Sequence, residues 1–304
     1  MDKSSAINYP KVSIIILNWN GLEDTMECLE SLRNLTYPNY EVIVVDNASE
    51  GDDVKVLREK FGEYIHLIEN DDNYGFARGN NIGIRYCLER GTDYIFLLNN
   101  DTIVDADFLG RLVEVAETDE MIGIASPMIY WYNQPDKIQF GGRLRINLLK
   151  GTVTAMKEKE ASKTTIGSDV ASGAAMLIKK TTVERIGLLP EEYFFGVEDV
   201  DYSIKTRRAG FKIVYIPRAK IWHKRARSVV KVGLTKIKYH FWSYQLVRRK
   251  YLSPPVFLLS TPYFVATSAT RFFLRSLRSR SWQELKDSPR IARAVLKGIV
   301  EAQK

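Results

Sequence analysis

The sequence predicts an α/β protein built around a mostly parallel sheet, and three observations support this class. Strand-like and helix-like patterns alternate along the N-terminal part of the chain. The strand-like pieces are short apolar runs, which are typical of strands covered on both faces. Polar residues follow several of these runs, as they do where parallel strands end at a ligand-binding edge. The alternation also predicts right-handed crossovers between strands.

The first elements follow from hydrophobic periodicity. Strands are expected where branched and aromatic residues run together, and helices where apolar residues recur every three or four positions. The expected strands are 11–17, 40–45, 65–68 and 94–98, and the expected helices are 22–32, 53–61 and 79–89.

The chain then continues the pattern with one interruption. Residues 130–170 contain aromatic and Gly-Gly pairs that suit an antiparallel insertion, and 172–178 is strand or turn material. Elsewhere we expect helices at 107–118 and 200–209, and strands at 122–128 and 212–216, the last one stopped by Pro217. These patterns predict a first domain over residues 1–230 and an extension over residues 231–304.

Three of the expected strands end in polar clusters, at residues 18–20, 46–49 and 99–101. Because the carboxyl ends of parallel strands meet at one edge, the clusters should face one site. A lone carboxylate such as Asp101 can hold Mg²⁺, which proteins usually bind through one or two carboxylates plus substrate phosphates. Asn and Asp also favour turns, so an ordinary strand-to-loop turn explains the same residues.

Composition narrows the class of protein. A chain of 304 residues with 45% hydrophobic and 27% charged residues is ordinary for a globular protein. The first residues lack the apolar run of a secretory signal, which predicts residence in the cytoplasm. Cys28 and Cys87 have no C-x-x-C partner and no nearby His, so we expect buried, reduced thiols.

Charge is divided unevenly along the chain. Residues 1–201 carry 20 Lys and Arg against 34 Asp and Glu, a net charge of −14. Residues 202–304 carry 24 Lys and Arg against 3 Asp and Glu, a net charge of +21. A basic region attached to an acidic body indicates an anionic partner, which could be nucleic acid, anionic lipid or a phosphorylated substrate.

Residues 251–270 form a 20-residue run without a charged residue, between Arg248–Lys250 and Arg271. That length could span a bilayer, but three prolines and six Ser or Thr residues oppose spanning. We expect the run to lie in the interface of an anionic membrane leaflet, where each nearby Lys or Arg contributes about 1 kcal/mol. The alternative is an ordinary helix packed on the body of the protein.

Six sequence blocks together carry a resemblance to a known family. They are VSIIILNWN (12–20), VVDNAS (44–49), NYGFARGNNIG (73–83), LLNNDT (97–102), SGAAMLI (172–178) and FFGVEDVDYSIKTRRAG (194–210). In this order and spacing the chain resembles glycosyltransferase family 2, especially its rhamnosyltransferase-like branch, over roughly residues 10–225. The resemblance implies the GT-A fold and inverting transfer from a nucleotide-diphosphate sugar, the co-substrate, in polysaccharide biosynthesis.

The resemblance also implies a donor-binding set. Asp46 would accept the N3–H of uracil or thymine, although it could instead cap the following turn. Arg78 and the residues after it open a helix, where a guanidinium and backbone N–H groups suit phosphate oxygens. Asn100 would lie near the ribose. The expected donor-binding residues are Asn18, Asn20, Asp46, Asn73, Arg78, Asn80 and Asn100.

A divalent metal, Mg²⁺ or Mn²⁺, is the implied cofactor. Asn99 departs from the family's usual D-x-D pattern, so Asp101 becomes the principal metal ligand. His223 resembles a late His that ligates the metal in family members, although a solvent-exposed or hydrogen-bonded His is the ordinary alternative.

The second carboxylate cluster carries the expected catalytic residues. Inverting transfer needs a base that removes the acceptor hydroxyl proton. By resemblance Asp199 is that base, and Glu198 orients the acceptor or the loop that carries the two carboxylates. Asp201 could serve the site or simply interact with the helix dipole in the first turn.

Competing classes fit less well. No G-x-G-x-x-G follows the first strand, which argues against a nicotinamide-dependent oxidoreductase. A non-catalytic membrane- or nucleic-acid-binding module is the remaining alternative, and Asp46, Asp101 and Asp199 together argue against it. We therefore expect a peripheral enzyme at the inner face of the membrane. Its expected donor is dTDP-rhamnose or a UDP-hexose, and its acceptor a glycan or polyprenyl-linked glycan; nucleic acid is not an expected partner.

Overall fold

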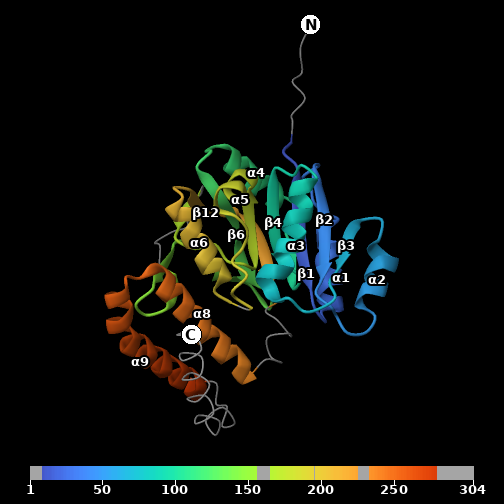
Figure 1. Cartoon of the computed structure of the whole chain (residues 1–304). Coiled ribbons are helices and arrows are strands. Elements are labelled where there is room, and N and C mark those ends of the chain that lie inside the picture. The colour runs from blue at the N-terminus through green and yellow to red at the C-terminus, as the bar shows by residue number, and fades with distance from the viewer. Residues whose placement is uncertain (1–8, 156–164, 195, 225–232, 279–304) are drawn as a thin grey trace.

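The protein is a sheet covered by helices on both faces, with two further helices attached to one side (Figure 1). The computed structural model describes residues 9–155, 165–194, 196–224 and 233–278. The boundary expected near residue 230, and the extension beyond residue 278, lie outside the described residues.

One half of the large sheet is parallel, as the alternation of strands and helices predicts. Its strands stand in the order β4-β1-β2-β3, and β1 pairs in parallel with both β2 and β4. The elements of this half are β1 (Val12–Asn18), α1 (Leu22–Leu32), β2 (Tyr40–Asp46), α2 (Asp53–Phe61), β3 (Ile65–Glu69), α3 (Gly75–Glu89) and β4 (Tyr94–Asn99).

The other half of the sheet is mixed. Strand β11 (Ala175–Lys179) lies antiparallel between β4 and β6 (Ile122–Trp131), and β12 (Lys212–His223) runs parallel to β6. Strand β11 therefore runs opposite to β4, whereas β6 and β12 run in the same direction as β4. The insertion expected over 130–170 supplies antiparallel strands at the margin. The remaining elements of the body are β5 (Thr102–Val104), α4 (Phe108–Glu117), β7 (Gln134–Phe140), β8 (Leu144–Asn147), β9 (Thr152–Ala155), β10 (Ile166–Ser168), α5 (Lys180–Ile186) and α6 (Glu198–Arg208).

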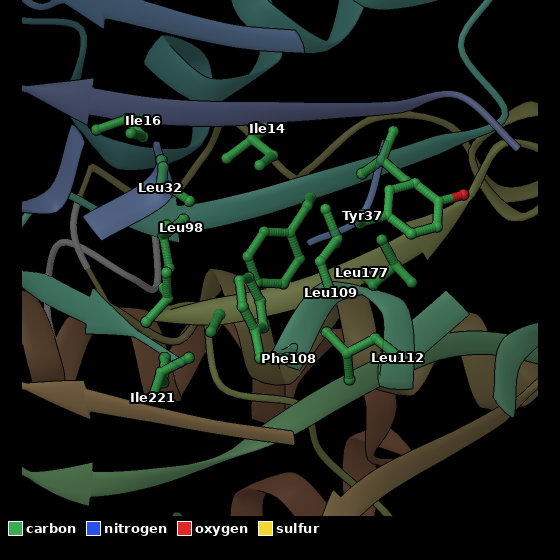
Figure 2. Close-up of a cluster of buried hydrophobic side chains, with 14 of the residues drawn as sticks. Ile14, Ile16, Leu32, Tyr37, Leu98, Phe108, Leu109, Leu112, Leu177 and Ile221 are labelled. Carbon is green, nitrogen blue, oxygen red and sulfur yellow. The ribbon is translucent and has the colours of Figure 1, made fainter. Parts of the chain in front are cut away.

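Each face of the sheet buries its own apolar cluster. Ile14 and Ile16 of β1 point to the face covered by α1, α2 and α4, whereas Ile15 points to the face covered by α3, α5 and α6. Figure 2 shows the first cluster, in which Phe108 and Leu112 of α4 pack against the strands. Burial on both faces explains why the strands are continuous apolar runs and not alternating ones.

Several elements differ from the sequence prediction. Helix α3 begins at Gly75, four residues before the expected start, and α6 begins at Glu198, two residues before it. The expected end of the last strand at Pro217 is wrong, because β12 runs to His223. A shift in register against β6 between Ile216 and Lys220 places this proline at an irregularity, where the missing N–H is tolerated.

The two C-terminal helices are α8 (Gly233–Tyr251) and α9 (Pro254–Arg278). Phe241, Tyr244 and Val247 of α8 and Phe264 of α9 share a buried cluster with residues of the body, including Val197 and Val200. Arg248 is fully buried in this cluster, where it donates to the carbonyl of Leu148 at 2.9 Å and to Ser260 Oγ at 2.7 Å. Across the described residues, no helix is long and apolar enough to cross a bilayer.

Candidate active site

The polar ends of β1 and β2 meet in register. Asn18 and Asp46 are paired residues of the two strands, and both are almost completely buried. Asp46 Oδ2 accepts hydrogen bonds from Asn18 Nδ2 and Ser49 Oγ, each at 2.7 Å, while Oδ1 accepts the backbone N–H of Ser49 at 2.8 Å. Asp46 therefore caps the turn after β2. A carboxylate offers about four acceptor positions, so the cap does not exhaust it.

A relay of side chains connects this corner to the end of β4. Thr25 of α1 donates to Asn18 Oδ1 at 2.8 Å and accepts from Asn100 Nδ2 at 2.9 Å. Gly21 makes the close approach possible, because a Cβ at this position would stand 2.5 Å from Asn100 Nδ2. We call Asn18, Asp46, Asn100 and Asp101 the strand-end cluster.

Asp101 and His223 are brought together by a strand that the sequence does not reveal. The three-residue β5 pairs antiparallel with the end of β12, so that Thr102 stands opposite His223. His223 Nε2 lies 3.0 Å from Asp101 Oδ1, and both side chains are largely buried. The other ring nitrogen, Nδ1, lies 2.8 Å from Gln139 Oε1 on β7.

This pair fits a divalent cation in its donor chemistry. Because the amide oxygen of Gln139 can only accept, a proton on Nδ1 satisfies it, and in that tautomer the Nε2 lone pair points to the side of Asp101, where an ion would lie. Outer partners of ligating histidines commonly fix the ring in this way. Two ligands about 2.1 Å from one ion at a right angle stand about 3 Å apart, which matches the observed separation. No group of three or more His, Cys, Asp or Glu in the described parts of the chain forms a complete cage. Two protein ligands suit an ion that is also bound by substrate phosphates.

Asn99 stands beside the same pair. Its backbone N–H donates to the carbonyl of Ala174 at 2.9 Å, and its side-chain nitrogen lies 3.5 Å from His223 Nε2. The position at which the chain departs from D-x-D therefore borders the Asp101–His223 pair without supplying a second negative charge.

The start of α3 is built from amides that cap the backbone. Asn73 Oδ1 accepts the N–H of Gly75 and the Nδ2 of Asn47, both at 2.9 Å. Asn80 is 1% exposed and donates to the carbonyl of Phe76 at 2.9 Å, so its present contacts are structural.

Two of the expected donor-binding residues lie at the surface. Arg78 is exposed, with its guanidinium carbon 3.7 Å from the centre of the Tyr74 ring. Asn20 is also exposed, in the left-handed region at φ 51°, and its Oδ1 accepts the N–H of Glu50 at 2.7 Å. The structure thus joins Asn18, Asp46 and Asn100 in one network, which reaches the backbone N–H of Asn20 through Ser49 Oγ. Asn73, Arg78 and Asn80 make separate contacts.

The second carboxylate pair begins α6. It follows Gly196 and Val197, which both have positive φ, 82° and 79°. A branched residue is rarely found in this region, so the surrounding structure must hold the backbone there. We call Tyr193, Val197, Glu198 and Asp199 the carboxylate turn.

Asp199 and Glu198 differ in their partners. Asp199 Oδ2 accepts the backbone N–H of Gly173 at 3.0 Å, and Oδ1 accepts that of Val200 at 2.8 Å. Glu198 is 6% exposed, and no group among the described residues hydrogen-bonds to its Oε2.

Burial changes the acidity of both groups. Burial and the neighbouring Asp199 carboxylate raise the pKa of Glu198 to about 8. Burial also raises the pKa of Asp199 above its ordinary value, against the opposing effect of the Gly173 and Val200 N–H groups. Two adjacent carboxylates in a buried place favour one shared negative charge over two. The two backbone N–H donors favour that charge on Asp199, and the raised pKa of Glu198 favours its neutral form.

A short turn connects the two carboxylate groups of the site. Gly173 donates to Asp199, and the next residue, Ala174, accepts from Asn99. The consecutive residues Gly173 and Ala174 therefore bridge Asp199 and Asn99. Asn99 is the last residue of β4 and precedes Asp101 by two positions. An aromatic edge closes this corner, because a Cβ on Gly173 would lie 3.5 Å from the Phe76 ring and 3.4 Å from Asp199 Cβ.

Several residues of the site were not found by sequence reasoning. Thr25, Gln139 and Gly173 hold Asn100, His223 and Asp199 respectively. Only Gly173 lies in a recognised block; Thr25 sits within a regular helix pattern, and Gln139 lies in the insertion, where no motif marks it.

A solved structure shows which fold class this is. The mannosyltransferase PcManGT from Pyrobaculum calidifontis, in complex with GDP-Man and Mn²⁺, aligns with a TM-score of 0.59 at 18% sequence identity, covering 98% of this chain and 87% of that one. This similarity establishes the GT-A fold of glycosyltransferases for the chain.

The sequence places the chain within one family of that class. The family model described as Glycosyl transferase family 2 matches residues 13–184, more than half of the chain, and the chain therefore belongs to this family and is a glycosyltransferase.

Named relatives share part of the sequence. The dTDP-rhamnosyl transferase RfbF of Shigella flexneri is 27% identical over 253 residues, covering 81% of this chain and 78% of the relative. The low-salt glycan biosynthesis hexosyltransferase Agl10 of Haloferax volcanii is 28% identical over 206 residues, covering 66% of this chain and 63% of the relative. The chain is thus similar to both rhamnosyl- and hexosyltransferases.

Proposed function

We propose that the protein transfers a sugar, with inversion, from dTDP-rhamnose or a UDP-hexose to a glycan or a polyprenyl-linked glycan. The observation that carries this proposal is the pairing of two preformed groups across the 173–174 turn. One is the Asp101–His223 pair, 3.0 Å apart, and the other is Asp199, held by two backbone N–H groups. The names of RfbF and Agl10 support these donor classes.

Asp199 acts as the general base in this proposal. The acceptor hydroxyl loses its proton to Asp199 as its oxygen bonds to the anomeric carbon, and the bond from that carbon to the diphosphate breaks on the opposite face. The raised pKa makes Asp199 a better proton acceptor than an ordinary carboxylate. The raised pKa of Glu198 favours its neutral form, which can donate a hydrogen bond to the acceptor without repelling a charge on Asp199.

The strand-end cluster and the start of α3 bind the donor. Asp46 has acceptor capacity left for the N3–H of a pyrimidine base, and Asn18 and Asn100 fix that corner. Exposed Arg78 is the cation available for diphosphate oxygens at the start of α3. Asp101 and His223 would hold Mg²⁺ or Mn²⁺, which supplies positive charge to the leaving diphosphate.

The acceptor brings the protein to the cytoplasmic face of a membrane in this proposal. Val256, Leu259 and Tyr263 of α9 recur at helical spacing and share one face, on which Leu259 is 83% exposed. Phe264 faces the body of the protein and is buried, so α9 both packs on the body and presents an apolar face. Its setting in the basic region of the chain favours an anionic lipid surface.

A donor panel tests the proposal directly. UDP-, dTDP- and GDP-sugars are added with and without Mn²⁺, and the unfolding temperature is followed. We expect stabilisation by a UDP- or dTDP-sugar that increases with Mn²⁺. The absence of a shift with every donor would contradict the proposal. Incubating labelled donors with a membrane extract then identifies the acceptor, and label found only in free sugar would argue against a lipid-linked one.

The membrane contact needs its own experiment. Flotation with vesicles of phosphatidylglycerol and of phosphatidylcholine compares the wild type, Leu259→Ser and Met121→Ser. Met121 is an exposed apolar residue on the body and provides the matched control. We expect selective binding to the anionic vesicles that only Leu259→Ser weakens. Equal binding by all three proteins would exclude the α9 face as the contact.

A further inference from the structure

Asp201 is a fully buried carboxylate that collects hydrogen bonds from two separate parts of the chain. Its Oδ2 accepts from the Tyr193 hydroxyl at 2.9 Å and from Lys250 Nζ at 2.7 Å, and its Oδ1 accepts from the Tyr251 hydroxyl. Tyr193 belongs to the carboxylate turn, whereas Lys250 and Tyr251 form the last turn of α8. The dipole of α6, considered from sequence for Asp201, accounts for none of these contacts.

These contacts compensate a charge that would otherwise be costly to bury. A carboxylate removed from water is tolerated only when it is paired and hydrogen-bonded. Lys250 supplies the positive charge, remains 38% exposed at its side chain, and also lies 3.1 Å from Glu192 Oε1. The Lys250 ammonium therefore bridges two carboxylates, Glu192 and Asp201.

The position of Asp201 matters because it closes the carboxylate turn. Its side chain holds Tyr193 at the beginning of the turn, and its backbone N–H donates to the carbonyl of Val197 at 3.0 Å. These two contacts hold both sides of the segment 193–197, whose last residue, Val197, has an unfavourable left-handed backbone conformation. The neighbouring structure must maintain that conformation. Asp199, two residues before Asp201 in the same helical turn, depends on this conformation for its placement.

Helix α8 is itself firmly seated. Val247 and Tyr244 pack in the same cluster as Val197 and Val200, and buried Arg248 fastens α8 to the turn between β8 and β9 and to α9. The last turn of α8 is therefore a fixed support for the groups that bind Asp201.

We infer that Asp201 is a positioning residue through which the last turn of α8 holds Asp199 in place for proton abstraction. The C-terminal helices then take part in building the active site, and their loss impairs turnover while donor binding at the strand-end cluster persists. The kinetic part of this inference rests on the proposed function, whereas the conformational part does not.

The test uses the full chain and variants at the edge of the network. Asp201→Asn leaves Lys250 without its buried partner and can unfold the protein, so Tyr251→Phe, which removes one hydroxyl, is the main variant. Tyr86→Phe is the matched control, since this partly buried tyrosine of α3 lies beside His66, away from both carboxylate groups. Hydrogen exchange of peptides covering the carboxylate turn and α6 is measured without ligand, and transfer is measured with dTDP-rhamnose and UDP-galactose over a membrane extract.

In Tyr251→Phe we expect exchange in these peptides to rise about tenfold, because a hydrogen bond to a charged group is lost. We expect kcat to fall about tenfold or more, since small displacements of a reacting group have effects of up to about a hundredfold, with donor KM changed less than about twofold. Tyr86→Phe should match the wild type in both measurements.

Unchanged exchange in Tyr251→Phe would overturn the inference, as would a rise in KM without a fall in kcat. If the wild type transfers no sugar, the proposed function fails, and the exchange comparison still decides whether α8 holds the carboxylate turn.

Discussion

The strand-end cluster and the carboxylate turn reach their geometry in different ways. Asn18 and Asp46 are terminal residues of neighbouring parallel strands, so backbone register alone brings their side chains together. Asp199 follows a left-handed Val197 and is held by Gly173 and, through Asp201, by a helix 50 residues further along the chain. Strand pairing alone therefore positions the side chains at the end of the sheet, whereas a base on a turn needs contacts from other elements to hold it.

The largest expected effect is the loss of turnover in Asp199→Asn, which separates catalysis by the carboxylate turn from nucleotide binding by the strand-end cluster. Asp199→Asn keeps the size of the side chain and its Gly173 contact as an acceptor but removes the base. Turnover should fall about 10²- to 10⁴-fold, the usual contribution of general-base catalysis, while nucleotide affinity stays within about twofold. Transfer assays and calorimetric titration with UDP and dTDP measure the two quantities. Near-normal turnover would remove Asp199 from its role.

The second prediction concerns the metal pair and leaves the carboxylate turn untouched. His223→Ala should raise the Mn²⁺ concentration needed for donor binding, and Gln139→Ala should do so by about tenfold or more through loss of the partner that orients the ring. Donor binding is titrated against Mn²⁺ at fixed UDP-sugar. Gln134→Ala, an exposed residue of the same strand, is the control. An unchanged metal titration in His223→Ala would count against this pair as the ligand set.

The last prediction is a pH dependence of stability that comes from Glu198. Its pKa, about 8 in the folded protein, lies above the ordinary value of 4.5, so the folded state binds more protons than the unfolded state between these limits. Stability is therefore greatest below pH 4.5 with respect to this group, and falls as pH rises towards 8, by at most about 1.4 kcal/mol per pH unit.

Glu198→Gln removes this titration. Denaturant unfolding at pH 5, 6, 7 and 8 should show a smaller loss of stability with rising pH in Glu198→Gln than in the wild type. Glu184→Gln, an exposed residue of α5, provides a control for the general effect of removing a carboxylate. Parallel curves for the wild type and Glu198→Gln would show that Glu198 ionises freely in the folded state.

Much of the fold is encoded locally. The strands of the parallel half and helices α1 and α2 lie where periodicity places them, because each is a short apolar or amphipathic run bounded by polar residues. The strand-end cluster follows from the same patterns, since residues that end parallel strands necessarily share an edge.

What the sequence determined by itself is the α/β class, the family blocks and the residue types at each strand end. The tertiary structure decided how those residues are held. Strand β5 is too short to show a period, and its pairing with β12, together with the hydrogen bond from the Lys224 N–H to the Asp101 carbonyl, sets Asp101 beside His223. The partners Gln139 and Tyr251 lie 84 and 50 residues from the side chains they hold, and contacts of that separation arise only when packed elements meet. The physical reason is that periodicity reports burial of a single element, whereas hydrogen bonds between elements depend on how they pack.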